Sequence, residues 1–366
     1  MTLPVLRLAG VPLPLVGPAR IYVCGITPYD VTHLGHASTF VWADVLARIL
    51  RGGGVETATC RNITDVDDVL DAAAHRAGAY VDRFAAVQQF RFDQDMTALG
   101  VRRPEHEPRA RGHIGQVIRL AGILLDGGHA YRRGGSVFLP GEAVARRAGL
   151  DQGRAGALVE EFGGHHEAAE NALDAVVWQS SSGDEPAWDS PWGRGRPGWH
   201  AECAAMALAT FGSSVDVHAG GRDLAFPHHA FEAAMAEAAT GVVPFARGWL
   251  HVGAVRKDGR KMAKSVGNLV LVGDLLASYP APAVRLLILD RPWASDWDFE
   301  PAAVDAAAGK LQDVYAAAAR SSGPTSAVPE VERALLDELD VPRALSIGLE
   351  AGGEAARRLS AILGLL

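Results

Sequence analysis

Two short segments carry side chains whose types and spacing suit the binding of a triphosphate, and the first contains two histidines. His33 and His36 stand three residues apart in the segment Thr32–His36, where a helix is predicted to begin. Both imidazoles would lie on one face of the turn, beside backbone N–H groups at the positive end of the helix dipole. The motif is short, and two histidines that start a helix without any ligand explain it equally well.

The second segment is a glycine-containing loop in which lysine is concentrated. Only four of the 35 basic residues are lysines, and Lys257, Lys261 and Lys264 all lie within Arg256–Ser265. The flexible ammonium group of lysine can follow phosphate oxygens as charge shifts between them, whereas the guanidinium of arginine is a rigid fork. Such charges stabilise the transition state when a phosphoryl or nucleotidyl group is transferred. A solvated basic loop is the alternative interpretation.

A third, dispersed set has the chemistry of zinc ligands. Cys24 ends a predicted strand, Cys203 lies in Trp199-His-Ala-Glu-Cys203, and Glu232 follows His228 by four residues, so these last two would share a helix face. Thiolate, imidazole and carboxylate groups are ordinary zinc ligands. Because compact Cys-x-x-Cys spacing is missing, buried free cysteines remain an alternative, and core packing is expected for Cys60.

Glycines followed by a carboxylate form a fourth pattern. Gly220 and Gly221 come after a predicted strand, and Asp223 comes two residues later. Glycine lets the backbone approach a ligand, and a carboxylate can accept hydrogen bonds from both hydroxyls of a ribose. A tight turn also explains the glycines. For the segment Asn62–Asp68, the alternative to a role in a site is that Thr64 caps a helix with acids in its first turn.

The composition indicates a folded protein with a large core. Of 366 residues, 48% are hydrophobic and 21% are charged, and the net charge is -8, so the chain is not of the disordered class. Neither a membrane-length apolar run nor a signal peptide is evident, and we expect a cytoplasmic protein without a membrane anchor. Three cysteines argue against a disulfide scaffold. The acidic balance gives no general basic surface for nucleic acid.

The predicted elements place the chemical groups near the ends of strands. After a hairpin over Val5–Leu15, a strand over Arg20–Cys24, a helix from Leu34 to the glycines at 52–54 and a strand over Thr57–Ile63 predict a parallel βαβ unit. Helices are predicted over Tyr80–Leu99, His113–Leu125 and Pro227–Thr240, and strands over Val215–His218 and Trp249–Val255.

Glycine pairs make residues 126–192 look irregular, like an insertion over the sheet, and the chain after Leu271 is predicted to be helical. We therefore divide the chain into a hairpin (1–20), the first half of a nucleotide-binding domain (21–125), the inserted region (126–192), the second half with the lysine loop (193–270) and a C-terminal helical bundle (271–366).

Taken together and in this order, the motifs resemble class I cysteinyl-tRNA synthetases and their shorter relative, the cysteine:glucosaminyl-inositol ligase of mycothiol biosynthesis. The resemblance covers roughly residues 20 to 290. It rests on His33-x-Gly-His36, Pro197-Gly-Trp-His-x-Glu-Cys203, Gly220-Gly-x-Asp-Leu-x-Phe-Pro-His228-His and Lys261-Met-Ala-Lys264-Ser. It implies an α/β protein with the Rossmann-type nucleotide-binding domain of class I aminoacyl-tRNA synthetases, an insertion and a C-terminal helical bundle.

The resemblance also implies a reaction, in which zinc grips the thiolate of L-cysteine and the cysteine carboxylate attacks the α-phosphorus of ATP, used with Mg²⁺. Pyrophosphate leaves and cysteinyl adenylate remains. The implied zinc ligands are Cys24, Cys203 and His228, with Glu232 as an open fourth, and the implied cysteine pocket is Thr27, Thr64 and Trp199. Implied ATP-binding residues are His33, Gly35, His36, Gly221, Asp223, Lys261, Lys264 and Ser265, of which the two histidines and the two lysines would be catalytic.

The acceptor of the cysteinyl group is expected to be a small amine, the amino group of glucosaminyl-inositol. Segments 25–30 and 32–36 look like the ligase's version of the signature, whereas the tRNA enzymes typically end the second motif in asparagine. We expect no anticodon-reading domain after Ser265, no tRNA partner and a monomer, with the inserted region and the C-terminal helices around the acceptor.

Three departures from the ligase keep another hypothesis open. Ala263 replaces the usual serine of the lysine loop, Glu232 matches a zinc ligand of the tRNA enzymes, and the chain is shorter than the usual ligase. A paralogue that cysteinylates another amine, a carrier protein or tRNA is therefore the alternative. A synthetase-like binding protein without activity is a third interpretation, disfavoured by the lysines, histidines and metal set.

Overall fold

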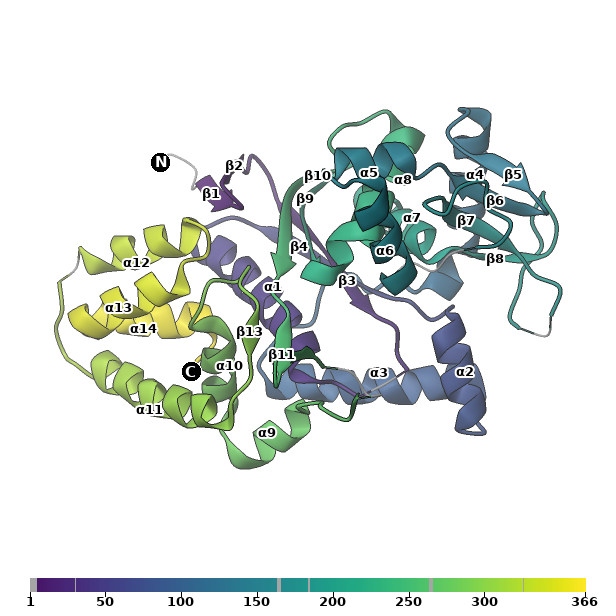
Figure 1. Cartoon of the computed structure of the whole chain (residues 1–366). Helices are drawn as coiled ribbons and strands as arrows, with labels where there is room; N and C mark the ends of the chain where they lie inside the picture. The colour runs from purple at the N-terminus through teal and green to yellow at the C-terminus, as the bar shows by residue number, and fades with distance from the viewer. Residues whose placement is uncertain (1–4, 30, 163–165, 184, 263–265, 325) are drawn as a thin grey trace.

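A four-stranded parallel sheet forms the centre of the protein, in the order β10, β9, β3 and β4 (Figure 1). The computed structural model describes residues 5–29, 31–162, 166–183, 185–262, 266–324 and 326–366. The strands are β3 (Ala19–Ile26), β4 (Thr57–Ile63), β9 (Val215–Gly221) and β10 (Ala246–Val252). The predicted parallel βαβ unit is confirmed, because β3 and β4 pair in parallel on either side of α1 (Leu34–Gly52) in the sequence.

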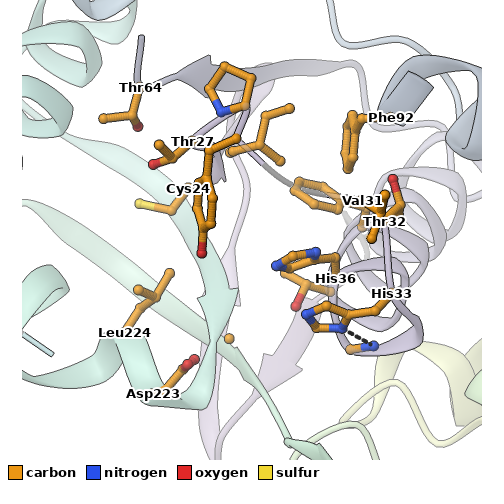
Figure 2. A pocket seen from close by; sticks show the side chains of 18 of the residues that line it. Cys24, Thr27, Val31, Thr32, His33, His36, Thr64, Phe92, Asp223 and Leu224 are labelled. Atoms are coloured by element: carbon orange, nitrogen blue, oxygen red, sulfur yellow. Dashed lines mark hydrogen bonds between the residues drawn. The ribbon is translucent and has the colours of Figure 1, made fainter. Parts of the chain in front are cut away.

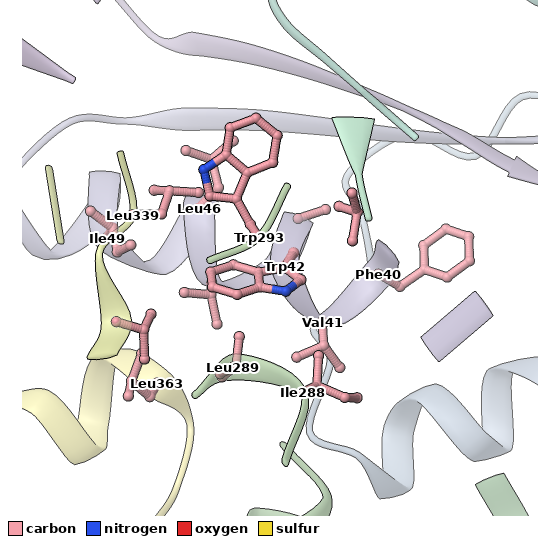
Figure 3. Packing of buried hydrophobic residues seen from close by; sticks show 14 of the residues in the cluster. Phe40, Val41, Trp42, Leu46, Ile49, Ile288, Leu289, Trp293, Leu339 and Leu363 are labelled. Atoms are coloured by element: carbon pink, nitrogen blue, oxygen red, sulfur yellow. The ribbon is translucent and has the colours of Figure 1, made fainter. Parts of the chain in front are cut away.

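One face of the sheet is covered by α1 and by the helices at the C-terminal end. Helix α1 begins after His33, ends at the predicted glycines and buries Trp42 against α10 and the chain beyond it (Figure 3). The helical prediction for the last part of the chain is confirmed apart from the two-residue strand β13 (Trp297–Asp298). Its helices are α9 (Val272–Ser278), α10 (Ala281–Leu289), α11 (Pro301–Ala318), α12 (Ala327–Leu336), α13 (Val341–Ala351) and α14 (Gly353–Leu363).

A buried ion pair joins α10 to α1 within this apolar layer. The guanidinium of Arg285 donates from Nη2 to Asp44 Oδ2 at 2.8 Å, from Nε to the Leu363 carbonyl at 2.9 Å and from Nη1 to the Leu99 carbonyl at 3.0 Å. The two charged side chains are 1% and 2% exposed. Each of the three guanidinium nitrogens therefore donates to a different part of the chain.

The other face of the sheet carries α7 (Trp199–Phe211), with α8 (Ala230–Thr240) and α4 (Ile114–Asp126) packed beside it. The expectation that residues 126–192 are irregular is wrong. They contain three strands of a four-stranded antiparallel sheet and two helices, and the strands are too short for alternation to be visible between the glycines. These elements are β5 (Tyr131–Arg133), β6 (Ser136–Leu139), α5 (Glu142–Arg147), α6 (Gln152–Phe162) and β7 (Ala175–Ser180), followed by β8 (Gly195–Pro197).

The remaining elements lie at the edges. The predicted N-terminal hairpin is confirmed as β1 (Val5–Leu8) and β2 (Val11–Pro14), which turn at Ala9 and Gly10 with positive φ at both positions. Helices α2 (Asp68–Arg76) and α3 (Val81–Ala98) follow β4, and β11 (Val255–Lys257) pairs with β12 (Arg260–Lys261). Within the described part of the chain, no helix is both long and apolar enough to cross a membrane.

The alternative interpretation of Thr64, that it caps the helix after β4, is wrong. Asp67 is the N-cap of α2, and its Oδ1 accepts from the backbone N–H groups of Val69 and Leu70 at 2.7 and 3.3 Å. Both residues are good capping types, and the structure uses the later one because the chain at Thr64 still follows β4. Thr64 N donates to the Ile26 carbonyl instead.

Candidate active site

A cavity of about 960 Å³ opens at the carboxyl ends of β3 and β9, where parallel α/β sheets usually bind ligands (Figure 2). Most residues predicted for the site line it. They are Cys24, Thr27, His33, Gly35, His36, Thr64, Trp199, Cys203, Gly221, Asp223, His228 and Lys261. Glu232 is fully buried beside Cys24 and His228. Lys264 and Ser265 lie outside the described residues, as does Ala263.

Strand alternation explains why Cys24 faces the helices that carry the other candidate ligands. Along β3, Ile21 and Val23 pack into the apolar core under α1, whereas Tyr22 and Cys24 belong to the core formed with α7 and α8. Cys203 comes from the second turn of α7, and His228 lies in a short irregular turn that precedes α8. Three separate elements therefore direct side chains to one point.

The four predicted ligand atoms do converge. One ligand atom from each of Cys24, Cys203, His228 and Glu232 lies within 4.8 Å of every other. Glu232 Oε1 is 3.3 Å from Cys24 Sγ and 2.9 Å from His228 Nε2. The prediction that His228 and Glu232 share a face is confirmed by this contact, although α8 itself begins only at Ala230.

The chemistry and spacing of this cluster fit a zinc ion. Tetrahedral zinc places sulfur, nitrogen and oxygen ligands about 2.0–2.3 Å from the metal, so the ligands lie about 3.3–3.8 Å from each other. An overlapping group of Cys24, Glu232, His218 and His229 also meets the distance condition. The group with two thiols matches the preference of soft ligands for zinc better.

Two further histidines hold the cluster in place, and the sequence analysis did not single them out. His200 Nδ1 lies 2.7 Å from Nδ1 of His228, and His218 Nε2 lies 3.0 Å from Oε2 of Glu232. Such partners fix the orientation of metal ligands. The sequence does concentrate histidine in this region, because five of the thirteen histidines fall between residues 200 and 251. This concentration could have pointed to His200 and His218.

Electrostatics favour anionic ligand atoms around an imidazolium. A hydrogen bond from Cys24 lowers the pKa of the Cys203 thiol, although burial opposes its ionisation, whereas burial raises the pKa of Cys24. Burial also disfavours a charged His228, but Glu232 and Cys203 outweigh it and raise the pKa of that imidazole to about 10. The site thus concentrates negative charge where a cation would be held.

Asn62, at the end of β4, connects the cluster to the neighbouring loop. Its Oδ1 accepts from Gly25 N at 2.9 Å, and its Nδ2 donates to Thr64 Oγ1 at 3.2 Å and to Cys203 Sγ at 3.3 Å. A side chain on Gly25 would place its Cβ only 1.7 Å from the Asn62 carbonyl oxygen. Glycine is therefore required for β3 and β4 to bring Thr27 and Thr64 to the same end of the cavity.

His33 and His36 occupy the opposite side of the cavity from Cys24 and Thr64 (Figure 2). His33 is the N-cap of α1, and its Nδ1 accepts from Gly35 N at 3.1 Å. The rings of His33 and His36 stack with centroids 3.8 Å apart. The predicted placement of both imidazoles on one face of a helix start is confirmed, in a position suited to an anion.

Asp223 and Lys261 form an ion pair at the rim of the cavity. Lys261 Nζ lies 2.7 Å from Asp223 Oδ2, and the two side chains are 54% and 39% exposed. Asp223 follows β9 directly, and Lys261 lies in the two-residue strand β12. Asp223 is expected to bind the ribose of ATP, and Lys261 is expected to bind its phosphates. The two side chains are therefore in contact with each other before any nucleotide binds.

The far wall of the cavity is built by α2 and α3. It presents Ala73, Arg76, Ala77, Phe84, Gln88, Arg91 and Phe92. The described residues that line the cavity come neither from 126–192 nor from 271–366. The expectation that these two regions surround the acceptor therefore stays a prediction.

A family model described as tRNA synthetases class I (C) catalytic domain matches residues 16–309 of the chain. A cysteine–tRNA ligase of Xanthomonas axonopodis pv. citri is 41% identical over 355 residues, covering 92% of this chain and 73% of that protein. The L-cysteine:1D-myo-inositol 2-amino-2-deoxy-alpha-D-glucopyranoside ligase of Thermomonospora curvata is 40% identical over 335 residues, covering 89% of this chain and 81% of that protein.

Solved structures share the fold at low sequence identity. Methionyl-tRNA synthetase of Mycobacterium tuberculosis, solved with methionyl-adenylate, has a TM-score of 0.69 at 16% identity, covering 96% of this chain and 89% of that one. The leucyl-tRNA synthetase agnB2 of Agrobacterium radiobacter K84 has a TM-score of 0.63 at 10% identity, covering 95% and 83%. These structures support the α/β fold with a parallel sheet and a helical C-terminal region.

Proposed function

The chain belongs to the family of class I (C) tRNA synthetase catalytic domains, and from this premise we propose that it is a ligase that activates L-cysteine with ATP. The observation that carries the proposal is the geometry of one cavity. It has a cluster of thiols, imidazole and carboxylate on one side and two stacked histidines at a helix start on the other. The first side can hold the thiol of an amino acid, and the second can hold the phosphates of ATP.

The cluster of Cys24, Cys203, His228 and Glu232 would hold zinc, with three firm ligands and the carboxylate of Glu232 as the fourth or as a partner displaced by substrate. When bound there, zinc supplies a soft Lewis acid that prefers a thiolate to a hydroxyl, which an apolar pocket alone distinguishes poorly. Thr27, Thr64 and the ring of Trp199, stacked 4.0 Å from His228, enclose the amino acid.

The remaining residues bind and orient ATP. His33 and His36 hold the phosphates at the positive start of α1, Gly35 and Gly221 allow close approach, and Asp223 accepts the ribose hydroxyls. The cysteine carboxylate attacks the α-phosphorus, pyrophosphate leaves with its bond electrons, and cysteinyl adenylate is formed. Lys261 and Lys264 stabilise the charge that develops on the pyrophosphate, with Mg²⁺ and Ser265 as further phosphate partners.

Cysteine-dependent exchange of pyrophosphate into ATP tests this proposal directly. We expect exchange with L-cysteine and at least 100-fold less with L-serine, since a soft metal site discriminates between sulfur and oxygen. Lys264→Ala is expected to slow exchange by about 10²–10³-fold, with little change in cysteine affinity, because its charge acts mainly in the transition state. A protein that binds cysteine and ATP but exchanges no pyrophosphate would contradict the proposed activity.

A small amine is the first candidate acceptor. The segment from Thr27 to His36 has the form typical of the glucosaminyl-inositol ligase, and a relative with that name is 40% identical. In this reaction the neutral amine of the sugar attacks the carbonyl carbon of cysteinyl adenylate, AMP leaves, the amine loses a proton and an amide is formed. An amino sugar is less basic than a lysine side chain and so offers a useful neutral fraction near pH 7.

A phosphate-bearing acceptor, tRNA, is the second candidate, and one observation favours it. Arg76 of α2 and Arg91 of α3 line the far wall of the cavity, both are exposed, and neither forms an ion pair with the residues that the structure describes. Phe84, Gln88 and Arg91 are spaced to share one face of α3. Cationic and aromatic side chains in one wall suit the phosphates and bases of a single-stranded RNA end better than a protonated amino sugar.

The two candidates are distinguished by incubating the enzyme, ATP and L-cysteine with glucosaminyl-inositol or with tRNA, and analysing the product by mass spectrometry. The double variant Arg76→Gln, Arg91→Gln is expected to keep pyrophosphate exchange. It should lose transfer to tRNA by about tenfold or more, since each phosphate contact adds to binding. Unchanged transfer to the amino sugar in this variant would favour the first candidate. Arg83→Gln, on α3 outside the cavity lining, is the matched control.

A further inference from the structure

Phe162 contacts the ammonium group of Lys261, although it comes from the inserted region and not from the nucleotide-binding halves. Lys261 Nζ lies 4.6 Å from the centroid of the Phe162 ring and, at the same time, 2.7 Å from Asp223 Oδ2. The ring face and the carboxylate thus hold the ammonium together. A cation over an aromatic face is attracted by the ring's quadrupole.

The backbone of Lys261 is hydrogen-bonded to neighbouring segments, and its long side chain can carry the charge to different partners. Lys261 pairs with Arg256 across β11 and β12, and Asn268 Nδ2 donates to the Lys261 carbonyl at 3.2 Å. The four-carbon stem of lysine is flexible and lets the ammonium reach different partners from one backbone position. The contacts with Phe162 and Asp223 therefore define one of its positions.

The position of Phe162 is set by packing next to the cysteine side of the cavity. Phe162 is the last residue of α6, which packs on the turn Ala225–His229 that carries His228. Val159, one turn earlier in α6, is buried beside Trp199, His200 and Phe231. Helix α6 thus spans from the residues around the thiol cluster to the lysine.

We propose that Phe162 is a positioning residue that holds Lys261 on Asp223 until ATP arrives. The inference rests on the proposed function in one respect, the assignment of Asp223 to the ribose of ATP. When the ribose hydroxyls take the carboxylate, Lys261 leaves both partners and turns to the phosphates. An exposed ion pair and an exposed cation–π contact are each weak, so the held position is readily reversed.

Nuclear magnetic resonance of lysine methylene groups tests the held position without any activity. The chain has four lysines, so protein labelled with ¹³C at the lysine ε-carbon gives few signals, and Lys261→Arg assigns the one of interest. Ring currents over the Phe162 face shift the Lys261 signal upfield, and we expect Phe162→Leu to abolish this shift. Addition of a magnesium complex of α,β-methylene ATP should abolish it in the wild type as well. Identical Lys261 signals in the wild type and in Phe162→Leu would overturn the proposal.

Binding of the same ATP analogue, measured by calorimetry without cysteine, gives the energetic test. Removing a contact that exists only before ATP binds should make binding tighter, by about two- to fivefold in Phe162→Leu for an exposed cation–π contact. Phe162→Tyr should behave like the wild type. Phe90→Leu, at an exposed phenylalanine of α3, controls for the substitution itself and should bind like the wild type.

The outcomes separate this role from the proposed activity. In pyrophosphate exchange, Phe162→Leu is expected to lower the KM for ATP and to leave kcat unchanged. A lower kcat with unchanged affinity for the analogue would contradict the proposal that Phe162 holds Lys261 on Asp223. Weaker binding of the analogue would contradict it as well. If the wild type binds the analogue but exchanges no pyrophosphate, the proposed function fails, whereas the methylene shift and the binding measurements still decide the role of Phe162.

Discussion

The two faces of the central sheet bury different kinds of side chain. On the side of α1 and the C-terminal helices the interior is largely aliphatic and aromatic, and Arg285 with Asp44 is a charged pair whose hydrogen bonds tie helices together. On the side of α7 and α8 the interior near the end of β3 contains Cys24, Cys203 and Glu232 with several histidines. Burying ionisable groups is unfavourable unless they are paired.

The two faces of the sheet therefore differ in what they contribute to stability and to function. The ion pair of the first face links elements that are far apart in the sequence, and each of the three guanidinium nitrogens of Arg285 has a protein acceptor. The cluster of the second face leaves His218 Nδ1 and His229 Nε2 buried without a hydrogen-bond partner. We therefore expect substitutions on the first face to change stability and those on the second to change metal content and activity.

The largest effect is expected at the ion pair. Arg285→Ala should destabilise the protein by about 3–5 kcal/mol, because it removes one of the two guanidinium partners of the buried Asp44, which keeps Arg48, and takes the donor from the Leu363 and Leu99 carbonyls. The measurement is the free energy of unfolding from denaturant titration. Arg103→Ala, which removes an exposed guanidinium 3.6 Å from Asp93, is the control and should change the free energy of unfolding by less than about 1 kcal/mol.

The zinc content of the same variants tests whether the two faces of the sheet act separately. Arg285→Ala protein that remains folded should keep its zinc and its exchange activity, since the pair lies on the opposite face of the sheet from the cluster. A loss of zinc in folded Arg285→Ala, with a normal circular dichroism spectrum, would show that the two faces do not act separately.

The next largest effect is expected for Cys203→Ser. It should reduce zinc from about one per chain to near zero and lower cysteine-dependent exchange on the order of 100-fold, because a hydroxyl is a poor substitute for a thiolate ligand. Metal analysis under conditions without chelators gives the first value and pyrophosphate exchange the second. Cys60→Ala, also buried but outside the ligand group, should retain the metal. Native protein without zinc would refute the metal hypothesis.

Much of the sheet and several of its helices could be predicted from the sequence, for physical reasons visible in particular elements. The buried strand β4 coincides with its predicted range, and α1 ends at the glycines that cannot extend a helix favourably. The antiparallel sheet of the insertion could not be predicted, because its strands of three to six residues are too short to show a period.

The residues of the candidate site that lie in local sequence motifs could be predicted. The residues that join the site only through three-dimensional packing could not. His33, His36, Cys203 and His228 lie in recognisable segments, and the structure brings all four to one cavity. His218 lies inside an apolar strand, and its contact with Glu232 of α8 arises only in the folded structure. Contacts between distant elements, such as Phe162 with Lys261, likewise leave no local pattern.

A smaller effect is expected for Glu232→Gln. The amide keeps the size of the side chain and one oxygen, so we expect zinc affinity to fall by about tenfold, less than in Cys24→Ser. Competition with a chromogenic chelator measures both affinities. If Glu232→Gln loses as much affinity as Cys24→Ser, Glu232 is a full ligand, and the substrate thiolate must then add to four protein ligands or displace one of them.

The smallest effect concerns the end of the sheet opposite the cavity, where Asp216 pairs with Arg20 and Arg247 at 3.1 and 2.8 Å. Burial opposes ionisation of Asp216, but hydrogen bonds from Arg20 and Arg247 outweigh it and lower its pKa. A carboxyl group whose folded-state pKa is depressed stabilises the protein above its unfolded pKa of about 3.9, and this contribution is lost as the pH falls through the folded value.

Asp216→Asn should therefore be less stable than the wild type at pH 6, by less than about 1 kcal/mol for a partly exposed pair, and the difference should shrink below about pH 4. Unfolding free energies of both proteins at pH 6, 4 and 3 measure it. Asp337→Asn, at an exposed pair with Arg7, is the control and should remain close to the wild type throughout. A difference between Asp216→Asn and the wild type that grows as the pH falls would contradict the assigned direction. Since the pair lies away from the cavity, zinc content should stay at the wild-type value in both variants. Charges at the starts of the strands would then affect stability without affecting the metal site at their carboxyl ends.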